Sequence, residues 1–561
     1  MPPYRRAYTT HERSPDAHSV RARTDYAPAL LVVWLAFWMA ACDASADRAA
    51  AAGGPASGGT LVIAGPTDLD HANPLVSADG WTQEINRFLL FLPLVRYDQD
   101  LSLEPLLAES WVMHGDTAVT FRLRHDVYWH DGRQTTAHDV RFTFEAATDT
   151  AVAHPSAGWF ADWLTVEVVD SFTVRAHFRP HADPLNGAAL LPIAPAHLLD
   201  TIPPAQLRAA AFNRAPIGNG PFRFVSQQPG DRWVLEANPD FPAALGGRPH
   251  LDRIVWRVIP DRQAQLAELL TGNADVVLIP PAEQFSELAA RPGLRGIVRP
   301  SFKYAFVGWN GLRGPFGDAR VRRALTMAID RTEILQALRD GNGTLAAAPV
   351  HPNHWAWDPA LEPLPFDTVA ARALLAEAGL RDRDGDGAIE STDGQALSFE
   401  LEFQANNDFN RNMAEMIAAD LAAIGVRAIP RPIDWNTLVN HVSSPDRDFD
   451  AVLMGWEADY RIDLRELFHS ASLGGPFQLA SYGTAEMDAL LDRAALTVDR
   501  QAALPLWHEI QRRLRDDQPW TFLYFFPDLI LASARVQGLH MDLRGALATL
   551  PAWWIAPVMA H

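Results

Sequence analysis

The order of apolar and polar positions predicts strands and helices that alternate along most of the chain. Apolar and polar residues alternate over 118–124, as in a half-buried strand, whereas 274–279 is almost continuously apolar, as in a buried strand. Residues 263–270 have helical spacing and lie between the expected strands 254–259 and 274–279. Strand, helix and strand in this order predict a βαβ unit with a parallel sheet.

The same pattern continues after residue 304 and predicts a second α/β block. Residues 318–338 carry apolar positions at helical spacing, which predicts one long amphipathic helix. We also expect strands over 60–64, 221–226, 232–237, 398–404, 426–430 and 450–454, and helices over 82–92, 137–147, 368–378 and 410–424.

The N-terminal segment has the pattern of an export signal. Residues 27–41 are 15 uncharged, mostly apolar residues, which is shorter than the roughly 20 residues that a membrane span requires. Five arginines precede this run, as in the positive region of a signal peptide. Small residues lead directly into Cys42, the only cysteine of the chain. This arrangement resembles the cleavage box of bacterial lipoproteins, in which the cysteine carries the lipid.

We therefore predict a lipoprotein signal peptide over 1–41 and a flexible tether over 42–58. The tether is rich in Ala, Gly and Ser and lacks large apolar side chains. The alternative is an uncleaved membrane anchor with an incidental cysteine at position 42. Lipidation predicts a chain that is exported and held on the periplasmic or extracellular face of the cytoplasmic membrane.

Composition limits the function classes that remain. With 561 residues, the chain exceeds what one hydrophobic core usually supports, so we expect at least two lobes. The formal net charge of −20 excludes the basic face that a nucleic-acid binder needs. One cysteine excludes an internal disulfide and Cys-rich metal sites.

Several motifs resemble bacterial extracellular solute-binding proteins of family 5, which includes oligopeptide-, dipeptide- and nickel-binding proteins. The resemblance extends over nearly the whole chain after the signal segment, and the motifs occur in the family's order and spacing. The motifs are LAESW at 107–111, FRLR at 121–124, WHDG at 129–132, IGNGPF at 217–222, ANPDF at 237–241 and DARVRRAL at 318–325.

This resemblance implies an α/β fold of the two-lobed periplasmic-binding-protein type, in the type II, large three-domain variant. Such a fold has a hinge and a cleft between the lobes. Carried onto this chain, lobe I covers 59–305 plus 523–561, with an inserted subdomain at about 96–215. Lobe II then covers 306–522.

The segment 454–460 is the candidate ligand site. It reads MGWEADY and resembles the family's cleft loop, in which an Asp pairs with the ammonium group of the ligand. We expect Asp459 to be this anchor, with Trp456, Glu457, Ala458 and Tyr460 beside it. A carboxylate in a dry cleft forms a charge-assisted hydrogen bond to an ammonium. The alternative for Asp459 is a helix cap in a surface turn.

Asn310 is a further candidate, because the chain is expected to cross into lobe II near this residue. Family members carry a similar Asn. Its two interpretations are ligand contact and capping of the hinge.

Residues 382–393 resemble a calcium-binding loop. Asp382, Asp384 and Asp386 stand at the first, third and fifth positions, with Gly at the sixth, and Asp393 stands at the twelfth. This spacing predicts a structural calcium, and the alternative is a solvated turn. We expect no other cofactor.

No pattern predicts catalysis. The chain lacks GxSxG, HExxH and the phosphate-binding GxxxxGK[ST] motif, so we expect a binding protein rather than an enzyme. The pair His351 and His354 could hold a metal chelate, but we interpret the histidines as surface residues.

The predicted function is the substrate-binding lipoprotein of an ABC importer. The chain would capture peptides or peptide-like solutes between its lobes and deliver them to a permease and its ATPase subunits. We expect a monomer, held at the membrane by its lipid, with no nucleic-acid partner. The alternatives are a non-peptide solute, such as a sugar oligomer or nickel chelate, and a sensory or adhesion lipoprotein outside transport.

Overall fold

The structure is a computed structural model, and it describes residue 55 and residues 57–556. The predicted signal peptide, Cys42 and nearly all of the tether lie outside the described residues. None of the described helices combines the length and apolar character that crossing a membrane requires.

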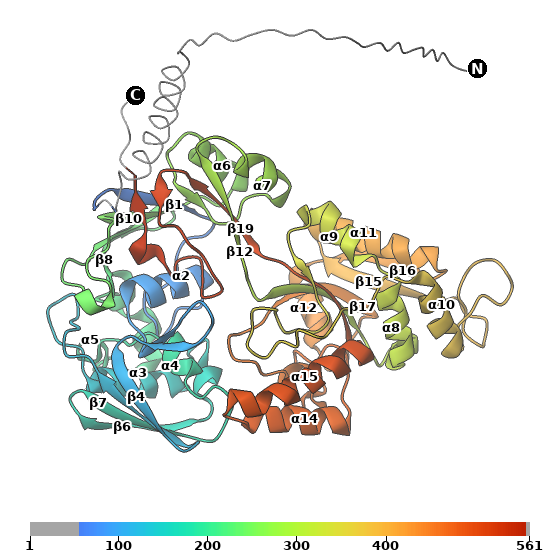
Figure 1. The fold of residues 1–561 in the computed structure, drawn as a ribbon, viewed down its shortest axis with the longest axis horizontal. Helices are drawn as coiled ribbons and strands as arrows, with labels where there is room; N and C mark the ends of the chain where they lie inside the picture. The colour runs from blue at the N-terminus through green and yellow to red at the C-terminus, as the bar shows by residue number, and fades with distance from the viewer. Residues whose placement is uncertain (1–54, 56, 557–561) are drawn as a thin grey trace, which may run out of the picture. The chain divides into compact units, whose positions relative to one another are not determined.

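The first lobe is built on a seven-stranded sheet in the order β12-β19-β11-β1-β10-β9-β8 (Figure 1). The central strand β1 runs parallel to both β10 and β11. Helix α6 (Arg262–Leu270) connects β10 to β11, so the predicted βαβ unit is confirmed, with β1 between its two strands. The strands are β1 (Thr60–Gly65), β8 (Phe222–Gln228), β9 (Arg232–Ala237), β10 (Arg253–Val258), β11 (Val276–Val277), β12 (Leu294–Arg299) and β19 (Asp528–Ser533).

An antiparallel four-stranded sheet, β4-β5-β7-β6, lies in the chain between β1 and β8. Its strands are β4 (Ala108–His114), β5 (Ala118–Leu123), β6 (Trp163–Asp170) and β7 (Thr173–Phe178). Helix α3 (Ala137–Thr148) packs on this sheet and begins at a capping box, in which Thr136 and Asp139 satisfy each other's backbone groups. The short strands β2 (Val95–Tyr97) and β3 (Leu103–Pro105) precede this sheet.

The second lobe is built on a mixed six-stranded sheet in the order β14-β18-β13-β17-β15-β16. Its strands are β13 (Lys303–Trp309), β14 (Thr344–Leu345), β15 (Ser398–Gln404), β16 (Arg427–Ile433), β17 (Ala451–Glu457) and β18 (Trp520–Phe525). Its longer helices are α8 (Ala319–Met327), α9 (Arg331–Arg339), α10 (Thr368–Glu377), α11 (Asp408–Ala423), α12 (Trp435–Ser443), α14 (Ala485–Leu496) and α15 (Arg500–Asp517).

Apolar clusters cover both faces of this six-stranded sheet. Along β13, Ala305 and Val307 belong to a cluster shared with α8, α10 and α11, whereas Tyr304 and Phe306 belong to one shared with α12, α14 and α15. Phe306 stacks on Trp520 of β18, with ring centroids 4.0 Å apart. A strand buried on both faces is continuously apolar.

Two crossing segments join the lobes. Residues 300–302 connect β12 of the first sheet to β13 of the second, and residues 526–527 connect β18 to β19. The predicted boundaries at 305/306 and 522/523 therefore fall inside β13 and β18, and the observed crossings lie at the ends of these strands.

Ion pairs fix the crossing segments to each other. Asp528 accepts a hydrogen bond from Arg299 and another, at 3.0 Å, from the Nζ of Lys303. Burial alone would raise the pKa of Asp528, but attraction to Arg299 and Lys303 outweighs burial and lowers this pKa. We call Arg299, Lys303 and Asp528 the hinge cluster.

Two sequence predictions are corrected by the structure. The single helix predicted over 318–338 is wrong, because Asp330 accepts hydrogen bonds from the backbone of Thr332 and Glu333 and begins a separate helix, α9. The strand predicted over 274–279 is reduced to Val276–Val277. Asp275 is the polar residue within this apolar run. Its carboxylate binds the guanidinium of Arg535, and the strand begins only at the next residue.

Candidate functional site

Strand β17 ends at a cavity that contains most of the predicted site residues. Trp456, Glu457, Ala458 and Asp459 line this cavity of about 300 Å³. We call it the anchor cavity; its other lining residues are Phe302, Tyr304, Pro349, Val350, His351, His354, Arg461, Ile462, Asp463, Leu464, Glu466, Leu467 and Phe477.

Pairing of β17 with β13 sets the direction of these side chains. Trp456 lies opposite Tyr304, and Glu457 lies opposite Lys303. Because side chains alternate along a strand, neighbouring residues of β17 point to opposite faces of the sheet. The indole ring of Trp456 packs edge-on against Phe477, with ring centroids 5.5 Å apart. The aromatic part of the cavity wall is therefore held by packing within the second lobe.

Protein groups crowd the Asp459 carboxylate and reduce its hydration, although the residue as a whole keeps contact with solvent. Its Oδ1 accepts a hydrogen bond from the backbone of Tyr460 at 2.7 Å, and its Oδ2 accepts one from the indole of Trp159 at 3.1 Å. Burial raises the pKa of Asp459, although both hydrogen bonds act in the opposite direction. This carboxylate would gain from a cationic partner.

Glu457 is a second acid at the same cavity. Burial raises its pKa, and attraction to Lys303 opposes this effect. Glu466 also lines the cavity, as does Asp463, which pairs with Arg461 and Arg465. Arg461 is the only arginine or lysine among the described lining residues, so acids outnumber cations. The anchor cavity therefore favours a positively charged group.

Tyr460 does not line the anchor cavity. Its ring stacks on Tyr97 of the first lobe, with centroids 5.3 Å apart and planes 9° apart. Its hydroxyl donates a hydrogen bond to the backbone oxygen of Arg544 at 2.5 Å. Tyr460 therefore joins the two lobes and lines a different pocket.

Asn310 lies away from the anchor cavity, and its predicted position at the crossing is corrected. It follows the far end of β13, whereas the chain crosses at residues 300–302. Its fully buried amide donates hydrogen bonds to the backbone oxygens of Arg447 at 2.9 Å and Phe449 at 2.8 Å. These contacts favour loop capping within the second lobe over ligand contact.

The pair His351 and His354 lines the anchor cavity, so our interpretation of this pair as surface residues was wrong. His354 is only 6% exposed, and burial lowers the pKa of both imidazoles to about 4. His354 contacts the backbone oxygen of Tyr460 through Nε2 at 3.1 Å and accepts from the backbone of Ala356 through Nδ1. The aromatic residues that follow this pair in the sequence could have indicated that the two histidines are not surface residues.

Contacts distant from the anchor cavity also join the lobes. Arg500, at the start of α15, pairs with Asp183 of the first lobe at 2.8 Å. Nearby, the backbone N–H of Ala182 donates to the oxygen of Ala495 at 2.7 Å. These contacts and that between Trp159 and Asp459 show that the two lobes touch.

Three of the four predicted calcium ligands lie together. Oxygen atoms of Asp382, Asp384 and Asp386 lie within 4.8 Å of one another on an exposed loop. Asp393 is not part of this group and accepts a hydrogen bond from Ser391. Calcium binding at this loop stays a prediction.

The comparison with protein families identifies the class. Residues 102–470 match the family model described as the middle part of bacterial extracellular solute-binding proteins, family 5. The chain belongs to this family. Family 5 consists of substrate-binding proteins rather than enzymes, and its members act outside the cytoplasm.

Individual family 5 members cover nearly the whole chain. The oligopeptide-binding protein AppA of Bacillus subtilis is 30% identical over 535 residues, which cover 93% of this chain and 97% of AppA. Its structure in complex with a nonapeptide covers 90% of this chain and 100% of that chain, with a TM-score of 0.72. The heme-binding protein A of Haemophilus influenzae is 27% identical and covers 83% of this chain and 87% of its own length.

A further solved structure supports the fold. The substrate-binding protein CtaP of Listeria monocytogenes is 23% identical and superposes with a TM-score of 0.80, over 89% of this chain and 100% of that chain. The predicted two-lobed type II fold of family 5 is therefore confirmed.

Proposed function

We propose that this chain is the substrate-binding lipoprotein of an ABC importer and captures peptides through their free amino end. The observation that carries this proposal is the Asp459 carboxylate, which lies at the end of β17 in a cavity with an excess of acids. A peptide ammonium would donate a charge-assisted hydrogen bond to this carboxylate. The similarity to an oligopeptide-binding protein over 93% of this chain supports the same solute class.

The remaining lining residues suit a solute with varied side chains. Trp456 and Phe477 offer flat apolar surface, and aromatic walls tolerate many side chains. A solute in contact with both lobes would stabilise the closed arrangement, since only that arrangement completes its contacts. The closed protein would then deliver the solute to a permease driven by ATPase subunits. Lipid on Cys42 would hold the protein at the membrane.

A metal chelate or heme is a weaker candidate for the anchor cavity. Both ring nitrogens of His354 have partners, and Nδ1 of His351 accepts a hydrogen bond from the backbone of Asn353 at 3.0 Å. Metal binding by His354 would require loss of these contacts. The acids and the engaged imidazole therefore favour an ammonium over a metal complex.

Identification of the bound solute tests the proposal. We expect mass spectrometry of the protein purified under native conditions to detect peptides. A mixture of short peptides should also raise the melting temperature, and N-acetylated peptides should raise it much less. Detection of sugars or metal complexes alone, with no response to peptides, would contradict the proposal.

Substitution of the anchor tests the residue assignment. Asp459→Ala should weaken peptide binding by about tenfold to hundredfold, the effect of losing one hydrogen bond between charged groups. Asp448→Ala is the matched control, because Asp448 is exposed and pairs with Arg313 on the surface of the same lobe. Equal peptide affinity of both variants would show that Asp459 does not bind the peptide.

A further inference from the structure

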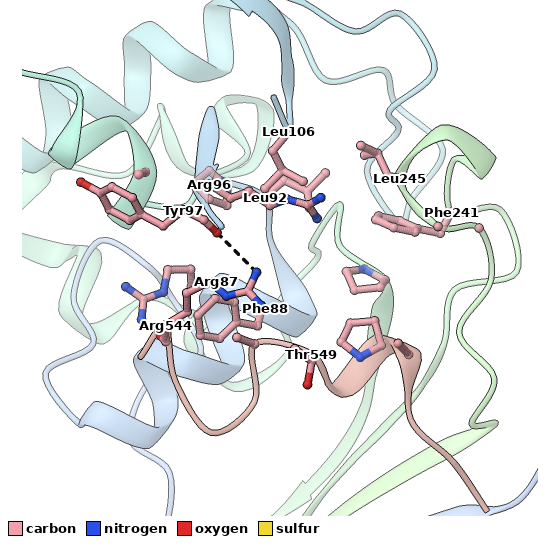
Figure 2. A pocket seen from close by; sticks show the side chains of 18 of the residues that line it. Arg87, Phe88, Leu92, Arg96, Tyr97, Leu106, Phe241, Leu245, Arg544 and Thr549 are labelled. Carbon is pink, nitrogen blue, oxygen red and sulfur yellow. Dashed lines mark hydrogen bonds between the residues drawn. The ribbon is translucent and has the colours of Figure 1, made fainter. Parts of the chain in front are cut away.

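A second pocket, of about 350 Å³, lies almost entirely in the first lobe. Figure 2 shows Phe241 and Leu245 on one side of this pocket and Arg87, Tyr97 and Arg544 on the other. The volume is within the range of about 300–1,000 Å³ that is usual for small-molecule sites. We call it the arginine pocket.

The arginine pocket combines an apolar lining with positive charge. Four arginines and a histidine line it, and none of the described residues that line it is an Asp or Glu. The cations are Arg87, Arg96, Arg248, Arg544 and His250. This composition is the reverse of that of the anchor cavity, where acids predominate.

Arg87 differs from the other three arginines. Arg96, Arg248 and Arg544 each form an ion pair with an acid that does not line the pocket: Glu104, Asp252 and Asp542, respectively. Within residues 55 and 57–556, no carboxylate lies within 4.0 Å of the Arg87 guanidinium. Its Nη2 donates a hydrogen bond to the backbone oxygen of Arg544 at 3.4 Å, and its buried Nε has no hydrogen-bond partner. A charge without an acid partner in a partly apolar site is costly unless an anion compensates it.

The backbone that presents Arg87 is unusual. Arg87 and Phe88 lie on η1 (Asn86–Leu90), one turn of π-helix that continues α2 (Gly80–Ile85). Such turns are rare and occur frequently at functional sites. The turn places the Arg87 guanidinium 4.6 Å from the ring centroid of Phe88, which restricts its position at the pocket wall.

We propose that the arginine pocket binds the carboxylate of an apolar acid, with Arg87 as its charged partner. The carboxylate would accept hydrogen bonds from the guanidinium, and the hydrocarbon part would pack among Phe88, Leu92 and Phe241. The acid can be a free carboxylic acid or the carboxyl end of a larger solute. This inference goes beyond the proposed function, because it does not depend on peptide binding at Asp459.

Tyr460 connects this pocket to lobe closure. It is the only residue of the second lobe in the described lining, and the Arg87 guanidinium lies 5.7 Å from its ring centroid. A ligand in the arginine pocket would therefore contact one side chain from the opposite lobe. Occupancy should favour the arrangement in which Tyr460 stacks on Tyr97.

Isothermal titration of the purified protein with octanoate tests the proposal, with octanol and octylamine as matched probes. We expect octanoate to bind and the two probes to bind at least tenfold more weakly. Arg87→Met should weaken octanoate binding by about tenfold to hundredfold. The control is Arg122→Met, since Arg122 is an exposed arginine on β5 that does not line the pocket.

A pocket-filling variant provides a second measurement that does not alter charge. Ala548→Phe should also reduce octanoate binding, because Ala548 lines the pocket. Absence of octanoate binding, equal binding of octanol, or unchanged affinity in both Arg87→Met and Ala548→Phe would overturn the proposal.

Competition distinguishes the two sources of the carboxylate. If peptides with a free carboxyl end displace octanoate and amidated peptides do not, one solute spans both cavities. If neither displaces it, the acid is a separate ligand; both results support a carboxylate site. Octanoate binding without any peptide binding would reject the proposed function and leave this inference standing.

Discussion

The indole of Trp159 donates a hydrogen bond to the Asp459 carboxylate at 3.1 Å and connects the two lobes at the predicted anchor. The donor comes from the short helix η2 (Ala157–Phe160) of the first lobe, and the acceptor follows β17 of the second lobe. The same carboxylate therefore serves as a contact between lobes and as a candidate ligand for an ammonium.

Peptide affinity should fall in mild acid. Burial raises the pKa of Asp459, and only the charged carboxylate attracts an ammonium. As pH falls through this raised pKa, affinity should be lost, beginning above the pH at which an ordinary Asp with a pKa of about 3.9 would protonate. Below the pKa the loss should approach about tenfold per pH unit. Calorimetric titration between pH 7.5 and 4 measures this dependence.

Trp159→Phe should shift that pH dependence to higher pH. The hydrogen bond from the Trp159 indole lowers the pKa of Asp459, so its loss should raise this pKa. Trp81→Phe is a control on another half-buried tryptophan of the first lobe, which packs against Trp256. Identical profiles for the wild type and Trp159→Phe would show that the indole does not act on Asp459.

Arg500 should influence the affinity for every solute equally. Its ion pair with Asp183 and its hydrogen bond to the backbone oxygen of Leu101 join the lobes without lining the anchor cavity. Arg500→Met should reduce the closed fraction and weaken all ligands by a common factor, about tenfold for a change of ~1.4 kcal/mol in closure. Affinities for two unrelated peptides, together with X-ray scattering, measure the effect.

The control for this variant lies on the same helix. Arg512 pairs with Glu509 within α15, and its side chain is 53% exposed. Arg512→Met should leave affinity unchanged. A loss confined to one peptide in Arg500→Met would indicate direct ligand contact instead.

The hinge cluster should contribute to stability. Asp528→Asn leaves Arg299 and Lys303 without their carboxylate, and breaking a buried pair costs about 3–5 kcal/mol. We expect the free energy of unfolding in urea to fall by about 3 kcal/mol. Glu400→Gln removes an exposed pair with Arg431 and should change it by less than about 1 kcal/mol. Equal effects would show that Asp528 is not an important stabilising partner.

His354 should make the protein sensitive to acid. Burial lowers its pKa to about 4, so the unfolded chain binds a proton that the native state excludes. The folded-state pKa is depressed, so this stability is present above about pH 6.5 and is lost as pH falls toward 4. The slope should reach at most about 1.4 kcal/mol per pH unit for this histidine.

Denaturation at several pH values measures this slope. His354→Gln should reduce it, whereas His138→Gln, at an exposed position of α3, should not. An unchanged slope in His354→Gln would mean that other groups account for the acid sensitivity.

The sequence predicted the local elements well, because strand alternation and helical spacing are properties of neighbouring residues. It also predicted that residues 456–459 follow a buried strand, whereas β17 continues to Glu457; the structure places all four residues at one cavity. The break at Asp330 was not predicted, since apolar spacing continues across it and only the capping hydrogen bonds begin a new helix.

Contacts between distant residues could not be read from the pattern. The role of Asn310 depends on backbone oxygens of residues 447 and 449, and the Trp159 contact with Asp459 joins residues 300 positions apart. The arginine pocket collects residues from Arg87 to Ala552, and no sequence motif includes any of its four arginines. Only the assembled fold shows that Arg87, unlike the other three arginines of the pocket, forms no ion pair with an acid of the described residues.

The hinge cluster also gives the molecule a built-in site for chemical labelling. Lys303 is the only lysine in the sequence, and its amine lies beside the strands that connect the lobes. Apart from the amino terminus, an amine-reactive dye therefore has a single target. A label that keeps this amine positively charged would preserve its pair with Asp528, and its fluorescence would report bending between the lobes.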